Sequence, residues 1–169
     1  MNREPILRRR IKLLTWLFII GLVVSGLTAI PLEWEMNRVL KIFGASHLTT
    51  DQAPSGLIKW LLKVCKGLQE TNAKFPFIAY GFDWLAFGHI VIAIVFVGAL
   101  RDPVRNIWLF DFGMIACALV LPWALIFGGV RGIPFAWRLI DCSFGVFGFI
   151  PLWLCKRWAR ELASQEPQN

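Results

Sequence analysis

The sequence predicts an all-α integral membrane protein, a four-helix bundle with an additional amphipathic helix at the membrane interface. Two observations lead to this fold class. Of the 169 residues, 57% are hydrophobic and 17% are charged, whereas an ordinary soluble domain has roughly 25% charged residues. The apolar residues also gather into four long runs. This composition excludes a disordered chain and disfavours a soluble enzyme, so we expect a single membrane domain.

The first span is predicted at residues 13–32, directly after the basic cluster that ends at Lys12. This uncharged run reaches about 30 Å as a helix, the thickness of a bilayer core. No small-residue cleavage site follows it, which favours a retained helix over a signal peptide. Gly21, Ser25 and Ala29 recur every four residues and predict a face for close helix packing.

Three further spans are predicted at residues 78–100, 103–130 and 135–155. Asp102 and Pro103 are typical of an N-cap followed by the first helical residue. The turn before the third span is then very short, and the second and third spans form an antiparallel hairpin. Pro122 predicts a kink in the third span.

The long connection, residues 33–77, holds the additional helix. Between Gly56 and Glu70 the apolar residues repeat with helical spacing; they are Leu57, Leu61, Val64, Cys65 and Leu68. The opposite stripe is charged and consists of Lys59, Lys63, Lys66 and Glu70. Such a helix can lie in the membrane interface with Trp60 at headgroup depth. It can equally cover one end of the bundle as a lid.

Four spans place both termini on one side of the membrane, and the positive-inside rule selects the side. Basic residues are dense in the short segments of the terminal side: Arg3, Arg8, Arg9, Arg10, Lys12, Arg101, Arg105, Lys156, Arg157 and Arg160. Those of the other side spread over a longer stretch: Arg38, Lys41, Lys59, Lys63, Lys66, Lys74, Arg131 and Arg138. We therefore expect a multi-pass protein of the cytoplasmic (inner) membrane, with both termini in the cytoplasm and residues 33–77 outside.

Ionisable side chains inside apolar spans are costly, and they are the first candidates for function. Counting along the spans brings two acids and two arginines to one level beneath the outer surface, with Tyr80 and Trp137 in the same layer and His89 about 9 Å deeper. The candidate binding pocket thus comprises Tyr80, Asp83, His89, Arg131, Trp137, Arg138 and Asp141. We assign no catalytic residue.

Two interpretations of this polar layer stay open. The acids and arginines can form neutral pairs that fasten helix ends, and Arg138 precedes Asp141 by a spacing at which the two can pair. Alternatively, the arginines bind an anionic headgroup while an aspartate or His89 moves a proton. For His89 alone, the structural interpretation is a hydrogen bond to a carbonyl or hydroxyl on a neighbouring helix.

The sequence also predicts the surroundings of Asp141 and of Asp111. Asp141 shares a stripe of the fourth span with Gly145, Gly148 and Leu152; the small residues predict that this stripe faces other helices. Asp111 lies near the inner end of the third span, where we expect it to pair with Arg101 or Lys12, or to bind a partner.

We expect neither a metal nor another cofactor. The four cysteines form no CxxC motif, which disfavours zinc and thiol-redox chemistry. A b-type haem would need two axial ligands within the bundle. However, His47 lies in the outer loop, and Met114, in the third span, lies toward the inner leaflet.

The layout of four spans with a long first connection is similar to that of DoxX-like proteins and of four-helix proteins related to sterol isomerases. The likeness is one of layout alone and implies no activity. The segments 83–89, 101–106 and 137–142 are suggestive of a bacterial membrane protein. The expected function is that of an accessory or scaffold subunit, which contacts lipid and either other membrane subunits or further copies of itself. The alternative is a membrane-embedded enzyme or binding protein for a lipid-like or anionic amphiphile in the outer-leaflet pocket. A nucleic-acid partner is not expected.

Overall fold

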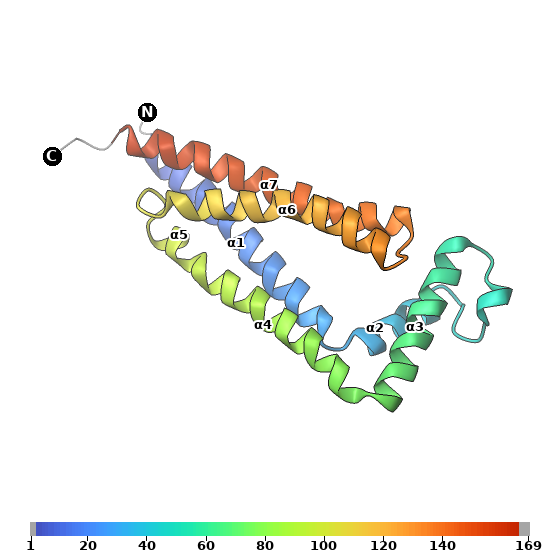
Figure 1. The fold of residues 1–169 in the computed structure, drawn as a ribbon. Helices are drawn as coiled ribbons and strands as arrows, with labels where there is room; N and C mark the ends of the chain where they lie inside the picture. Colours follow the sequence, from blue (N-terminus) through green and yellow to red (C-terminus); the bar gives the residue numbers. More distant parts are fainter. Residues whose placement is uncertain (1–2, 166–169) are drawn as a thin grey trace. The chain divides into compact units, whose positions relative to one another are not determined.

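The computed structural model describes residues 3–165, and over this range every regular element is a helix. The elements are α1 (Glu4–Ala29), α2 (Leu32–Ile42), α3 (Gly56–Lys74), α4 (Tyr80–Val95), α5 (Val97–Arg101), α6 (Ile107–Val130) and α7 (Phe135–Ala163), with two short 3-10 helices, η1 (Thr50–Gln52) and η2 (Pro76–Ala79) (Figure 1). Four helical stretches are long and apolar enough to cross a membrane: Glu4–Ala29, Pro76–Arg101, Ile107–Val130 and Phe135–Ala163. The predicted all-α class and the four apolar helices are confirmed, and they fit a multi-pass membrane protein.

The first and last of these helices extend beyond their predicted spans into basic segments. α1 begins at Glu4 rather than at residue 13 and ends at Ala29, and α7 continues past residue 155 to Ala163. Near the start of α1, Arg8 Nε donates to Glu4 Oε1 at 2.9 Å, a pairing one helical turn apart that stabilises a helix. Charged residues with long side chains are good helix formers, so the helix does not stop where the apolar run stops.

The predicted start of the third span at Asp102 and Pro103 is wrong, because α6 begins at Ile107. Asp102 caps the turn instead of the helix. Its Oδ1 accepts hydrogen bonds from the backbone N–H groups of Val104 at 3.2 Å and Arg105 at 2.9 Å. An aspartate that binds the backbone two and three residues ahead is typical of a tight turn. The connection is short, as predicted, but the acid stabilises the connection itself.

The chain divides into two compact units. One, the terminal unit, comprises the chain up to Leu22 and from Val91 onward; the other, the loop unit, comprises Val23–Ile90. α1 and α4 each run from one unit into the other.

The terminal unit is built on the antiparallel pair α6 and α7, which lie side by side (Figure 1). The turn between them contains Gly132 at φ +68°, a conformation that favours glycine. A Cβ on Gly145 would lie 2.5 Å from the carbonyl oxygen of Cys117, and one on Gly148 would lie 2.7 Å from its Sγ. Leu152, on the same stripe, is fully buried. The prediction that this stripe of α7 faces another helix is confirmed for Gly145, Gly148 and Leu152.

The N-terminal half of α1 packs beside the C-terminal half of α7 in the same unit. Thr15 Oγ1 lies 3.9 Å from Cys155 Sγ, and this thiol contacts the carbonyl oxygen of Ile11 at 3.8 Å. The rings of Phe18 and Phe96 pack in a tilted arrangement with centroids 4.8 Å apart. The start of α1 and the end of α7 therefore share one end of the unit. The side chains buried most completely here are Phe96, Phe110, Ile11, Leu109, Leu152, Leu162, Thr15 and Cys155.

In the loop unit, the segment between Gly56 and Glu70 lies within α3. α3 begins after Ser55, whose Oγ accepts from the backbone N–H of Ile58 at 3.3 Å, a standard N-cap. The buried side chains of α3 are Ile58, Leu61, Leu62 and Cys65, and the helix packs against α2. The buried face is rotated slightly from the predicted one, because Leu57 is exposed. That this helix lies in a membrane interface stays a prediction.

A close approach between α1 and α4 in the loop unit occurs at Gly26. A Cβ there would lie 2.8 Å from the His89 Cβ and 3.4 Å from the Ala86 Cα, whereas Gly21 has no neighbour within 4 Å. The predicted packing face through Gly21 is thus wrong. The sequence contains two glycines on different faces of this helix, and the spacing alone selected the one without a neighbour.

Candidate functional site

The predicted pocket divides between the two units. Tyr80, Asp83 and His89 belong to the loop unit, and Arg131, Trp137, Arg138 and Asp141 belong to the terminal unit. The pocket as a whole therefore stays a prediction, and each group is described within its own unit.

In the loop unit, Tyr80 and Asp83 line an open hollow of about 230 Å³ with Trp84 and Phe87. The Trp84 ring makes edge contacts with the rings of Tyr80, at a centroid distance of 6.0 Å, and Phe87, at 5.5 Å. The Asp83 side chain is on the exposed side of α4. This arrangement is an aromatic surface with one carboxylate at its edge.

The His89 side chain is hydrogen-bonded to a carbonyl of its own helix. The expected hydrogen bond to a carbonyl or hydroxyl of a neighbouring helix is therefore wrong. Its Nδ1 lies 2.8 Å from the carbonyl oxygen of Leu85. A carbonyl can only accept, so Nδ1 carries the proton. The helix that His89 faces in this unit presents Gly26, which has no side chain to offer as a partner.

In the terminal unit, Arg138 does not pair with Asp141. Its Nη1 donates to the carbonyl oxygen of Leu125 at 3.1 Å, and its guanidinium lies 5.3 Å from the centre of the Phe135 ring. Its aliphatic stem packs where a side chain on Gly128 would otherwise lie. The arginine is thereby committed to the α6 backbone, and no ion pair links it to Asp141 within residues 3–165.

Arg131 and Trp137 flank the turn between the two helices. Arg131 is exposed at the C-terminal end of α6, and Trp137 is half-buried near the start of α7. Neither side chain takes part in an ion pair or side-chain hydrogen bond in the part of the chain that the structure describes. The neutral Asp–Arg pairs expected within this unit are therefore not formed.

Asp141 stands out as an acid in an apolar groove. It is half-buried and lines an open hollow of about 410 Å³ between α6 and α7, with Ala116, Leu119, Val120, Trp123 and Ala124. Its carboxylate has no ion pair and no hydrogen bond to any residue between 3 and 165. We call this hollow the Asp141 groove.

Asp111 pairs with Lys156 of α7, so the predicted partners Arg101 and Lys12 are wrong. The Lys156 side chain is 18% exposed and that of Asp111 is 42% exposed. The pairing follows from the packing of α6 on α7, which turns Asp111 toward the neighbouring helix. A half-buried carboxylate is thereby neutralised inside a span.

Beside this ion pair lies a basic hollow of about 260 Å³ at the C-terminal end of α7. It is lined by Met114, Trp153, Lys156, Arg157 and Arg160, and we call it the basic pocket. The Arg157 guanidinium lies 5.9 Å from the centre of the Trp153 ring. In the sequence these basic residues indicate only the orientation of the chain, and they do not predict a pocket.

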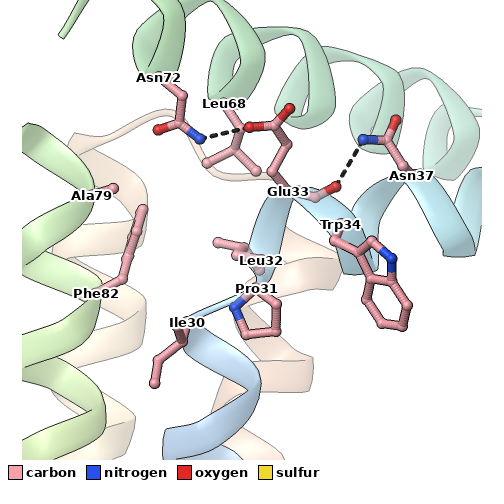
Figure 2. A pocket seen from close by; sticks show the side chains of 10 residues that line it. All are labelled: Ile30, Pro31, Leu32, Glu33, Trp34, Asn37, Leu68, Asn72, Ala79 and Phe82. Carbon is pink, nitrogen blue, oxygen red and sulfur yellow. Dashed lines mark hydrogen bonds between the residues drawn. The ribbon is translucent and has the colours of Figure 1, made fainter. Parts of the chain in front are cut away.

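The loop unit also contains a groove of about 420 Å³ that the sequence does not predict (Figure 2). Asn72 Nδ2 donates to Glu33 Oε2 at 2.6 Å, and Asn37 Nδ2 donates to the Glu33 carbonyl oxygen at 3.0 Å. The Asn37 Oδ1 accepts from Cys65 Sγ and Gln69 Nε2, each at 3.3 Å. The available signal was the one-turn spacing of Glu33 and Asn37 in α2, which aligns two polar groups on one face.

The network affects the chemistry of Cys65. Burial raises the pKa of this thiol, and the negative charge of Glu33 raises it further. The sulfur therefore stays protonated at neutral pH and serves as the donor to Asn37. All four cysteines are free thiols.

In comparisons with known proteins, the chain matches no family model, no curated protein and no solved structure. Within residues 3–165, no three His, Cys, Asp or Glu side chains are grouped so that they could hold a metal ion.

Proposed function

We propose that this protein is an accessory subunit of a larger membrane assembly and that it holds a helix of a partner membrane protein in the Asp141 groove. The observation that carries the proposal is the unpartnered Asp141 carboxylate. Asp141 lies in the second turn of α7, where an ionised carboxylate beside apolar side chains carries a desolvation cost unless it is paired. A partner helix with a lysine, an arginine or a hydrogen-bond donor at this level would remove much of that cost.

The walls of the groove support an occupant of this kind. Trp123, at 67% exposure, and Leu119 present large apolar surfaces beside Asp141. Two small side chains, Ala116 and Ala124, also line the groove and leave space beside Leu119 and Trp123. Small residues beside a polar group are typical of helix–helix contacts in membranes, where close approach and interhelical hydrogen bonds replace the hydrophobic effect.

In the competing interpretation, Asp141 forms an ion pair within the chain that holds two helices together. That role needs a cationic partner within the chain, and Arg138, one turn away on α7, has the spacing to provide it. Arg138 instead donates to Leu125 and packs on Gly128. The carboxylate therefore stays available to a second molecule.

Site-specific photocrosslinking tests the proposal. A photoreactive amino acid at Leu119 is expected to yield one predominant protein adduct in the native membrane. The adduct peptide should be an apolar helix with a basic or hydrogen-bond-donating residue. Asp141→Leu should abolish the adduct and Asp141→Glu should retain it. Asp51→Asn, which removes a carboxylate from the exposed η1 turn, is the control and should leave the yield unchanged.

Three results would contradict the accessory role. An adduct that forms at full yield in Asp141→Leu would show that the carboxylate does not select the partner. Crosslinking to lipid alone would show that acyl chains fill the groove. An adduct between two copies of this chain would replace the accessory subunit with a homo-oligomer.

A further inference from the structure

We propose that the basic pocket binds the phosphate headgroup of an anionic glycerophospholipid. This inference does not depend on the Asp141 groove, because the two sites use different residues at different levels of α6 and α7. The proposal specifies where one lipid binds on the protein and which class of headgroup it carries.

The charges of the pocket are only partly compensated by the protein. Lys156 is engaged by Asp111. Arg157 and Arg160 form no ion pair within residues 3–165, although Glu161 follows Arg157 at one-turn spacing on α7. The arginines are left with uncompensated positive charge. Guanidinium groups bind phosphate oxygens in a bidentate manner.

The position of the pocket selects a lipid over a free phosphate ion. It lies where the apolar part of α7 gives way to its basic end, and Met114 and Trp153 supply apolar surface beside the arginines. A tryptophan at this level is typical of the membrane interface. A phospholipid could place its phosphate on Arg157 and Arg160 and its glycerol and acyl groups on Trp153 and Met114. Inorganic phosphate could use only the arginines.

The pocket is held in place by packing on its opposite side. Cys155, Ala159 and Leu162 are buried against the rest of the terminal unit, and Lys156 is tied to α6 through Asp111. The side chains of Arg157 and Arg160 therefore project from a fixed helical platform. A preorganised site binds its ligand more tightly than a mobile one, because less motion is lost on binding.

Native mass spectrometry of the full-length protein can measure this binding. The detergent-solubilised protein is titrated with phosphatidylglycerol or with phosphatidylcholine, whose choline cation offsets the phosphate charge. We expect phosphatidylglycerol to bind in preference and to survive competition by millimolar inorganic phosphate. Arg157→Gln and Arg160→Gln should each weaken the binding about fivefold, and both together roughly thirtyfold, by the usual effect of one basic residue at a membrane surface.

Lys12→Gln is the matched control, because it removes the same charge from an exposed position of α1 in the same unit. It should leave the affinity unchanged, and thermal melting should show that all variants stay folded. Equal binding of the two lipids by the unmodified protein would overturn the proposal. So would displacement by inorganic phosphate, or an equal loss of affinity in Lys12→Gln and the arginine variants.

Discussion

The contact between α6 and α7 makes a quantitative prediction for Gly145→Ala. A Cβ at this position would lie 2.5 Å from the carbonyl oxygen of Cys117 and 2.9 Å from Leu121 Cδ1. The leucine can change rotamer, but the backbone carbonyl cannot, so the helices must separate. Overpacking of this kind costs about 1–3 kcal/mol. Alanine regains about 0.5–1 kcal/mol of helix propensity, which leaves a net loss of roughly 0.5–2 kcal/mol in the free energy of unfolding.

The assay is thermal unfolding in a mild detergent, followed by tryptophan fluorescence. For a chain of this size each kcal/mol moves Tm by about 2–4 °C, so Gly145→Ala should melt roughly 1–8 °C below the unmodified protein. Gly21→Ala is the control, because no atom lies within 4 Å of its Cβ position; its Tm should rise slightly. If Gly145→Ala melted at or above the Tm of Gly21→Ala, the close approach of α6 and α7 would be refuted.

Three further predictions follow from the polar contacts. Lys156→Met should leave the Asp111 carboxylate unpartnered and lower the free energy of unfolding by about 1–3 kcal/mol, while adding Asp111→Asn should restore much of the loss; identical melting of Lys156→Met and the unmodified protein would refute the ion pair's role. Glu33→Gln should lower the raised pKa of Cys65, because it removes one of the two causes; more thiolate then forms at pH 8, so alkylation in a chain whose other cysteines are serine should be faster, and an unchanged rate would show that Glu33 does not act on the thiol. Ser55→Ala should remove the N-cap of α3 at a cost of about 1 kcal/mol, seen as faster hydrogen exchange in the first turn of that helix, and unaltered exchange would contradict the cap.

Hydropathy was sufficient to find the four long helices, because an apolar run of bilayer length has few alternatives to a helix. It could not find the helix ends. The basic residues before Leu13 and after Cys155 are good helix formers, so α1 and α7 continue through them. The prediction that Asp102 is a helix N-cap was wrong for a related reason. An aspartate before proline is equally typical of a helix start and of a tight turn.

Pairing between side chains was harder to predict than helix position. Depth counting placed Asp111 beside Arg101 and Lys12, but the rotation of α6 against α7 selected Lys156. The Arg138 side chain likewise found a backbone carbonyl in place of Asp141. Rotation about a helix axis depends on which small residues permit close approach, and only the stripe through Gly145 and Gly148 could be identified in advance.

The groove around Glu33 shows a different limit of sequence reasoning. Its polar groups come from α2 and α3, whose mutual packing brings Glu33 to Asn72. Neither residue lies in an apolar run, where a polar or ionisable side chain is costly and therefore indicates function. Non-local pairs of ordinary polar residues carry no signal in a single sequence.

The most direct test of the proposed role is a density map of the protein extracted in native membrane nanodiscs without detergent. We predict that a helix from another polypeptide lies over Leu119 and Trp123, with a basic or hydrogen-bond-donating side chain facing Asp141. A groove that contains acyl chains alone, with Asp141 facing lipid, would contradict the accessory role.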